Sequence, residues 1–354
     1  MILSGKFGFS KTQRYLFLVA LFAIVLGVVF YGVFQYNLTQ QGKGGVKDEE
    51  QKNQALGEVT TSTLSFLNGL SVPITSATSC AAVMIDNNPE VEQHFGLNAA
   101  ALVYEAPVEG GITRFMAVYH LTTSTVATIG PVRSARPYFL DWLQEINCMY
   151  VHVGGSNEAL DKIESTNIFD LNQFYNGGYF WRNTRYVAPH NTFTDIENLT
   201  AAWEKKNKNF SGQEVKSWLF AKQEGVSSKK LNQTAIYIDR VGGWQVGWIF
   251  NPKNKMWERW LNKSAVFDEK NKIIQAKNVV IQYVRTEVLD DVGRLAVKTI
   301  GSGRADILKD DKIINGRWKK KSATAKTKFF GPDTKEIEFN PGVIWIEVEP
   351  EILK

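Results

Sequence analysis

Residues 80–86 read CAAVMID, an apolar run that begins with a cysteine and ends at a carboxylate. Residues 148–153, CMYVHV, follow the same plan and lead into two glycines. Short runs rich in apolar and β-branched residues are typical of buried strands. If the two strands are parallel neighbours, about 4.8 Å apart, Cys80 and Cys148 come within reach of a disulfide. We therefore predict a bond between these cysteines, and two buried free thiols are the alternative.

The sequence around these two segments predicts an α/β domain over residues 72–220. Further strands are expected at residues 101–105, 114–121 and 126–129. Between the strands, residues 134–146 and 156–166 have helical spacing, and Ser156 is a suitable N-cap because an acidic residue follows in the first turn. Strands that alternate with helices are the pattern of an α/β fold.

The composition changes across residues 221–235, which we assign as a linker. Residues 236–354 then alternate strand-like runs with the turn signals NPKN, FGPD and NPG. No convincing helical pattern interrupts the strands after Asn278. A series of strands joined by turns predicts a second, mainly antiparallel β domain.

An apolar run near the N-terminus predicts a membrane anchor. Residues 15–34 read YLFLVALFAIVLGVVFYGVF, and a helix needs about 20 such residues to cross a bilayer. The preceding flank has basic residues and no acidic one, while the following flank is neutral, which places the N-terminus in the cytoplasm. We expect residues 1–14 to be a cytoplasmic stub and residues 15–36 a transmembrane signal anchor in the cell membrane. The body is then extracytoplasmic.

Other arrangements of the N-terminus fit the sequence less well. A cleaved signal peptide needs a shorter apolar region and a small-residue cleavage site, which residues 32–37, GVFQYN, do not offer. Neither cysteine lies near the apolar run to accept a lipid. Residues 37–71 are rich in polar residues and poor in aromatic ones, a composition that favours a flexible tether. An exported body also lies where disulfides persist.

Several blocks of sequence resemble a known bacterial family. The blocks in the first half are VEGGITRF (108–115), IGPVRSARPYF (129–139) and YVHVGGS (150–156). Those in the second half are AKNVVIQYV (276–284), IGSGRADILKDDKIINGRWKK (300–320) and NPGVIWIEVEP (340–350). In wording and order they resemble the YerB-like family, a two-part domain of unknown function that carries a lipoprotein label. The resemblance covers nearly all of residues 71–354. It implies the cellular location and the domain architecture of the protein, and it implies no reaction. The lipid-accepting cysteine that the label implies is missing here.

Polar side chains gather where predicted strands end. The candidate ligand-binding residues are Arg114, Arg133, Arg136, His152, Gly154, Gly155, Arg182, His190 and Asn191. Guanidinium groups and free backbone N–H groups both suit phosphate or carboxylate, and open α/β sheets gather ligands at such strand ends. The alternative is that these side chains pair with acids inside the fold, as Arg133 would with Asp141.

Two carboxylates at strand ends, Asp86 and Glu105, are candidate ligands for a divalent cation such as Mg²⁺. The sequence has no metal-binding pair at helical spacing, no C-x-x-C, no P-loop and no G-x-S-x-G motif. Zinc hydrolysis, thiol redox, NTP hydrolysis and esterase chemistry therefore lack support. The net charge of +5 is spread along the chain, so nucleic acid is not an expected partner.

Three functions remain open. The first is binding of an anionic, phosphate- or carboxylate-bearing ligand of the cell envelope through the arginine- and glycine-rich cleft. The second is a cation-assisted transferase or hydrolase for lipid-linked pyrophosphate, since the spacing of G-x-T-R and P-x-R-x-x-R is similar to that in LytR-type cell-wall ligases. The third is a protein-interaction scaffold of the envelope, in which the tryptophan-rich residues 244–260 dock a protein partner.

Overall fold

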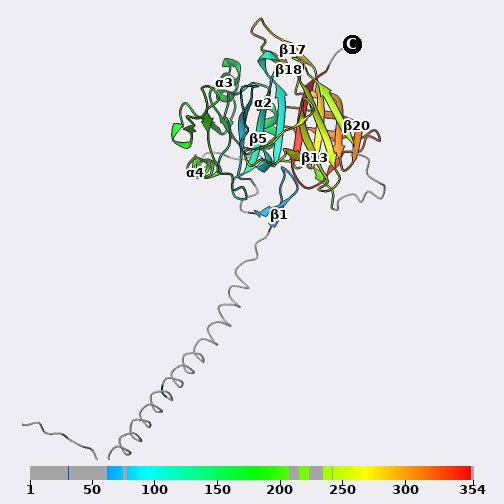
Figure 1. Cartoon of the computed structure of the whole chain (residues 1–354), viewed down its shortest axis with the longest axis horizontal. Coiled ribbons are helices and arrows are strands. Elements are labelled where there is room, and N and C mark those ends of the chain that lie inside the picture. The colour runs from blue at the N-terminus through cyan, green and yellow to red at the C-terminus, as the bar shows by residue number, and fades with distance from the viewer. Residues whose placement is uncertain are drawn as a thin grey trace, which may run out of the picture. The chain divides into compact units, whose positions relative to one another are not determined.

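One large β-sheet runs through the folded body of the computed structural model (Figure 1). In spatial order its strands are β21 (Lys328–Phe330), β20 (Lys312–Lys320), β19 (Gly301–Lys309), β16 (Asn278–Val284), β23 (Ile344–Pro350), β4 (Leu102–Pro107), β5 (Thr113–His120), β3 (Cys80–Asn87), β6 (Met149–His152) and β7 (Asp170–Asn172). The structure describes residues 31, 62–74, 78–206, 215–222, 234–240 and 242–351. Residues Ser62–Lys354 cluster as one unit.

The two halves of the sequence share this sheet. Strand β23 is parallel to β16 on one side and to β4 on the other, so it joins strands from the first and second halves. The first half is mixed, because β3 is antiparallel to β5 and parallel to β6. Beyond β16, strands β19, β20 and β21 are antiparallel to their neighbours, as expected for the β-rich half. The two predicted parts are present, and they are joined edge to edge.

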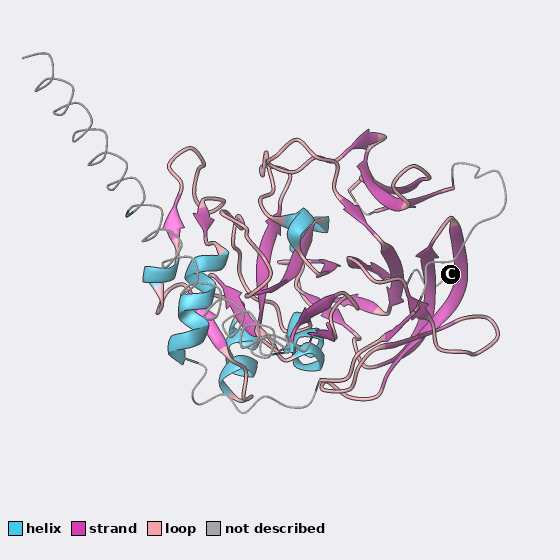
Figure 2. Cartoon of the chain, turned by 90° about the horizontal axis from the view of Figure 1, so that it is seen from below, coloured by secondary structure: helices cyan, strands magenta, loops and turns pink. Residues whose placement is uncertain are grey.

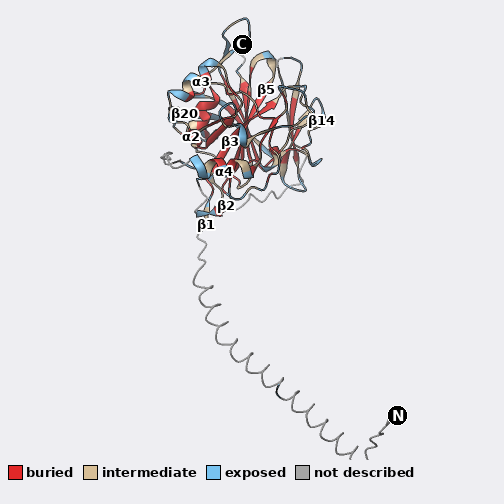
Figure 3. Ribbon diagram, turned by 90° about the vertical axis from the view of Figure 1, so that its left-hand side faces the viewer, coloured by how far each residue is buried: buried red, intermediate tan, exposed pale blue. Residues whose placement is uncertain are grey.

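The helices pack on the strands from the first half of the sequence, which is also where helical spacing was predicted. They are α2 (Phe139–Ile146), α3 (Asn157–Glu164) and α4 (Ile196–Lys206). The predicted N-cap is confirmed, because the Ser156 hydroxyl accepts a hydrogen bond from the Ala159 N–H at 3.3 Å. Helices α2 and α3 pack on one face of the sheet and α4 packs on the other. Buried residues fill the strands between these layers (Figure 3).

A second, smaller sheet covers part of the face on which α4 lies. Figure 2 shows how far strands outweigh helices in the described body. The strands of the smaller sheet are β11 (Ala235–Asp239), β12 (Gln245–Asn251), β13 (Met256–Leu261), β14 (Ser264–Ala265) and β15 (Gln275–Ala276). Trp248 and Trp257 of this sheet are fully buried in the same hydrophobic core as Trp345 and Phe115 of the large sheet, and the Trp248 ring lies against the Trp345 ring at a centroid distance of 5.3 Å. Tryptophans proposed above as interface anchors are therefore partly core residues.

Short elements complete the described body. They are the strands β1 (Ser62–Leu64), β2 (Ser71–Pro73), β8 (Trp181–Arg182), β9 (Thr192–Phe193), β10 (Leu219–Phe220), β17 (Thr286–Val288), β18 (Leu295–Val297) and β22 (Glu338–Phe339), and the 3₁₀ turns η2 (Leu97–Ala99), η3 (Glu109–Gly111) and η4 (Gly177–Tyr179). No strand forms over residues 126–129, where Ile129 makes a single bridge to Thr194.

The folded body begins earlier than the sequence suggested. The tether was expected to extend to residue 71, but β1 pairs with β2, and Phe66 and Leu67 between them join the core because they are apolar. The predicted linker, residues 221–235, lies mostly outside the described residues. The same is true of the predicted anchor, residues 15–36, of which Tyr31 alone is described. Among the described residues, no helix is both long and apolar enough to span a bilayer.

Cys80 and Cys148 form a disulfide with an S–S distance of 2.04 Å and a Cα–Cα distance of 5.0 Å. Strands β3 and β6 are parallel neighbours, with Ala81 opposite Met149, so each cysteine stands at the same level of its strand. The shared plan of the two sequence segments therefore corresponds to their adjacency in the sheet.

Candidate functional site

Five charged side chains meet where β3 ends and β5 begins, and we call them the arginine cluster: Asp86, Glu109, Arg114, Arg133 and Arg136. Asp86 and Arg114 stand opposite each other on the paired strands β3 and β5. The loop after Ile129 runs along the end of β3, and its backbone is fixed there by hydrogen bonds to that strand. This loop carries two of the three arginines.

Two of the arginines are paired with acids of the fold. The Arg133 Nε lies 2.8 Å from Asp86 Oδ2. The Arg136 guanidinium binds Glu109 through two hydrogen bonds, of 2.6 Å from Nε and 2.7 Å from Nη2. Arg133 thus pairs with Asp86 and not with Asp141, the partner considered from the sequence. Both arginines keep some solvent exposure, 24% for the side chain of Arg133 and 16% for that of Arg136.

Arg114 has no carboxylate of its own in this arrangement. Its Nη1 donates to the backbone oxygen of Ser134 at 2.7 Å, and its Nε has no hydrogen-bond partner. The residue is 4% exposed. Burial and the nearby charges of Arg136 and Arg133 lower the pKa of Arg114 to about 10, against the opposing effect of Asp86. The cluster therefore holds three guanidinium groups against two carboxylates, a surplus of one positive charge.

The loop before β9 brings further predicted residues to the cluster. The His190 Nδ1 lies 2.6 Å from Asp86 Oδ2, and its Nε2 lies 3.2 Å from Glu90 Oε2. Asn191 accepts a hydrogen bond of 2.7 Å from the exposed Arg182. His190 therefore belongs to the edge of the cluster, while Arg182 and Asn191 form a separate polar pair on the same loop.

The predicted residues on β6 have a supporting role. His152 is fully buried, with Nδ1 2.7 Å from the Gly154 oxygen and Nε2 2.6 Å from Asp170 Oδ1. The Gly154 oxygen also accepts from the Ala135 N–H at 2.9 Å, and Gly155 forms a bridge with Ala135. Since Ala135 lies between two of the arginines, this turn holds the arginine loop in place. Both ring nitrogens of His152 are therefore used within the fold.

The two proposed cation ligands do not come together. Asp86 is opposite Arg114 on β5, whereas Glu105 of β4 is opposite Phe115, the next residue of that strand. Successive side chains of a strand point to opposite faces, so the two carboxylates lie on different faces of the sheet. Each is already bound to arginine. Within the described part of the chain, no group of three His, Cys, Asp or Glu residues is arranged to hold a metal ion.

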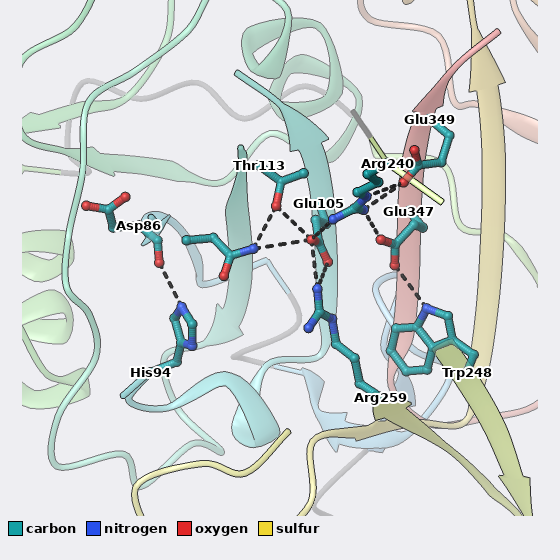
Figure 4. Close-up of polar contacts among 10 residues, drawn as sticks. Asp86, His94, Glu105, Thr113, Arg240, Trp248, Arg259, Glu347 and Glu349 are labelled. Atoms are coloured by element: carbon teal, nitrogen blue, oxygen red, sulfur yellow. Dashed lines mark hydrogen bonds and ion pairs between the residues drawn. The ribbon is translucent and has the colours of Figure 1, made fainter. Parts of the chain in front are cut away.

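The other face of the sheet carries a charged group that sequence reasoning missed, the buried glutamate network of Glu105, Arg240, Arg259, Glu347 and Glu349 (Figure 4). Arg240 donates to Glu105 at 2.7 Å, to Glu349 at 2.8 Å and also to Glu347. Arg259 donates through Nη2 to both oxygens of Glu105, at 2.9 and 3.0 Å. All five residues are almost fully buried, and the two arginines lie on either side of Glu105.

Neutral donors complete the network. The Thr113 hydroxyl donates to Glu105 Oε1 at 2.7 Å, and the Asn87 Nδ2 lies 2.6 Å from that hydroxyl oxygen. The Trp248 Nε1 donates to Glu347 Oε2 at 3.0 Å. Each glutamate is therefore held by at least one directed hydrogen bond, which offsets part of the cost of burying its charge.

Three carboxylates face two guanidinium groups, so the network has a surplus of one negative charge. Burial raises the pKa of Glu105, but Arg259 and Arg240 outweigh it and bring this pKa down to about 2. Burial, together with Glu105, raises the pKa of Glu347 to about 8, and burial also raises the pKa of Glu349. Near pH 7 one proton is therefore shared by Glu347 and Glu349.

A signal for this network was present in the sequence. Glu347 and Glu349 stand at alternate positions in IWIEVEP, and Arg259 interrupts the apolar pattern of MWERWL. Alternate residues of a strand share a face, so the two glutamates point to the same side. A charged residue inside an otherwise apolar strand needs a partner when it is buried. The pattern identifies such residues, although it does not identify their partners.

Comparison with known proteins places this architecture. Two family models match: the N-terminal domain of "Protein of unknown function (DUF3048)" over residues 67–211 and its C-terminal domain over residues 236–346. The chain belongs to the DUF3048 family. A relative named "Putative lipoprotein YerB", from Bacillus subtilis (strain 168), is 27% identical over 274 residues, which cover 77% of this chain and 81% of that protein. The crystal structure of YerB from Bacillus subtilis superposes with a TM-score of 0.70 at 26% identity, covering 82% of this chain and 97% of that one.

The resemblance inferred from the sequence blocks is confirmed by these matches. The two family domains contribute differently to the two charged groups. The arginine cluster lies wholly within the first domain. The buried glutamate network joins Glu105 of the first domain to Arg240 and Arg259 of the second.

Proposed function

We propose that this chain is a membrane-held extracytoplasmic protein that binds an anionic ligand of the cell envelope, bearing phosphate or carboxylate, at the arginine cluster. The apolar run of residues 15–34 supports the membrane attachment, as does the lipoprotein name of the Bacillus relative. The observation that carries the proposal is the surplus guanidinium of Arg114, which is buried with one carbonyl partner.

A bound anion would offset this surplus. A buried charge without a counter-charge is costly, and an anion beside the cluster lowers that cost. Arg133 and Arg136 are partly exposed, and both flank Arg114 closely enough to lower its pKa. Guanidinium groups bind phosphate and carboxylate through paired hydrogen bonds. An anion reached from solvent through these two arginines would then lie next to Arg114.

The test is calorimetric titration of the full-length chain in detergent with pyrophosphate and with citrate, at low and high salt. We expect binding that weakens with salt, because the attraction is partly exposed to solvent. Arg133→Gln and Arg136→Gln should each weaken binding about tenfold, since a hydrogen bond to a charged group contributes about 1.5–3 kcal/mol.

Arg285→Gln is the matched control, because Arg285 is 59% exposed and pairs with Glu287 away from the cluster. Equal binding by all variants, or no binding of any anion, would overturn the proposal. Release of phosphate from a lipid-linked pyrophosphate by the same samples would make the cluster an active site and favour the transferase or hydrolase alternative.

A further inference from the structure

A pocket of about 160 Å³ adjoins the buried glutamate network, on the sheet face opposite the arginine cluster. We call it the network pocket and define it by the residues Asn87, His94, Ile112, Trp244, Arg259 and Leu261. These residues come from both halves of the sequence. The pocket therefore exists only when the second sheet is packed on the first.

Several polar groups of the pocket retain hydrogen-bonding capacity. Arg259 is 2% exposed and uses Nη2 for Glu105, while its Nε has no partner. The His94 Nε2 lies 3.0 Å from the backbone oxygen of Asp86 and must carry the proton, which leaves Nδ1 as an acceptor. Burial and the charge of Arg259 lower the pKa of His94 to about 4, so this ring is neutral at pH 7. Asn87 donates through Nδ2 to Glu105, and its Oδ1 is a second acceptor.

The charges around the pocket select against ions of either sign. With its shared proton the glutamate network carries no net charge near pH 7, so its two guanidinium groups are already balanced and offer an anion no unpaired counter-charge. Among the described residues, however, those that line the pocket include Arg240 and Arg259 and none of the three glutamates. A cation would therefore meet guanidinium groups first. The ligand that fits both conditions is neutral and has hydroxyl or amide groups.

Much of the remaining wall is apolar and includes one large ring. Trp244, Ile112 and Leu261 are half-buried and line the same pocket. A pyranose ring has a rim of hydroxyl groups, which both donate and accept hydrogen bonds, and a C–H face that packs on an aromatic ring. Ligand pockets generally combine apolar walls with a few placed polar groups. We infer that the network pocket binds one neutral saccharide unit, with its apolar face on Trp244 and its hydroxyl groups on Arg259, His94 and Asn87.

The experiment compares three sugars that differ mainly in charge. N-acetylglucosamine is neutral, glucosamine is cationic and glucuronate is anionic. Each is titrated into the full-length chain in a zwitterionic detergent that contains no sugar, and binding is followed by saturation-transfer NMR and calorimetry. We expect the neutral sugar to bind and both charged sugars to bind at least about tenfold more weakly, since a mismatched group leaves buried polar atoms unpaired.

Two variants test the position of the site. Trp244→Ala and His94→Ala should each weaken binding of N-acetylglucosamine about tenfold, which is the effect of losing one apolar or polar contact. Trp203→Ala, a half-buried tryptophan of α4 outside the pocket, should leave it unchanged. Thermal unfolding of each variant shows whether the fold is kept.

Each outcome bears on the inference. Binding of a neutral oligosaccharide but not of the single sugar would keep the site and place it along a glycan chain. Tighter binding of the charged sugars, no binding of any sugar, or binding unaffected by both variants would overturn it. The arginine variants described above should not change sugar binding, so failure of the anion site and failure of the network pocket are distinguishable.

Discussion

Because Glu347 and Glu349 share a proton, we expect the stability of the fold to depend on pH. Both oxygens of Glu347 accept N–H hydrogen bonds, from Arg240 and from Trp248, whereas the bonds from Arg240 to Glu349 go to Oε1. We therefore place the proton on Oε2 of Glu349. Glu349→Gln reproduces this protonated form, because the amide keeps an acceptor toward Arg240 and puts its NH₂ group where the hydroxyl lies.

The raised pKa decides whether stability rises or falls with pH. A carboxyl group whose pKa is higher in the folded state contributes stability that is present below its unfolded pKa and is lost as pH rises through its folded pKa. Because the two carboxyl groups titrate as a pair, the pKa of about 8 at Glu347 marks the upper end of the window, which begins at the ordinary carboxyl value of 4.5. Each pH unit within it removes about 1.4 kcal/mol of the free energy of unfolding. Between pH 5.5 and 7.5 the unsubstituted chain should lose at most about 2.7 kcal/mol from this source.

The assay is urea unfolding of residues 62–354 at pH 5.5, 6.5 and 7.5, followed by tryptophan fluorescence. Glu349→Gln should remove this part of the pH dependence, so its stability relative to the unsubstituted protein should rise with pH. Glu347→Gln should instead destabilise at every pH, because its NH₂ group would face an N–H donor on one side or the other. Glu338→Gln, an exposed glutamate of β22, is the control. If the free energy of unfolding of Glu349→Gln and of the unsubstituted protein changed with pH in the same way, the shared proton would be refuted.

Two further predictions concern the core. Replacing both cysteines by serine should lower the free energy of unfolding by about 4 kcal/mol, because the bond closes a loop of 68 residues; an unchanged urea midpoint would contradict this. Lys320→Ala should cost about 3 kcal/mol, because Lys320 lies 2.6 Å from the buried Glu145 and its removal breaks this ion pair, although Tyr104 and Thr327 still donate to the carboxylate. The double variant with Glu145→Gln should recover part of the loss, and equal stability of the single and double variants would refute the pairing.

Local patterns in the sequence predicted the local structure well. The strand at residues 80–86 and the N-cap at Ser156 depend on side chains within a few positions of one another, and both form as expected. The adjacency of β3 and β6 was visible because CAAVMID and CMYVHV share one plan. The change from alternating strands and helices to strands joined by turns predicted the two-part layout, and the family resemblance agreed with it.

Partnerships between distant segments could not be predicted in this way. Glu105 and Arg240 are 135 residues apart and meet only because the second sheet packs over β4. Arg133 pairs with Asp86, since the loop after Ile129 runs back along β3, while Asp141 is taken by Lys162 at 2.7 Å. Which acid lies beside which base is set by register and packing, and the alternating patterns specify neither.

The position of β23 has a consequence for how the protein is made. This strand follows every other strand of the large sheet in sequence, yet it lies between β16 and β4. During synthesis, β4 therefore emerges long before β23. Until β23 pairs with it, one edge of β4 has unpaired backbone hydrogen-bonding groups, and such an edge can pair with other chains. The first half can fold early as a unit, but its edge is closed only when residues 344–350 arrive. A chain truncated before Ile344 should accordingly be prone to self-association.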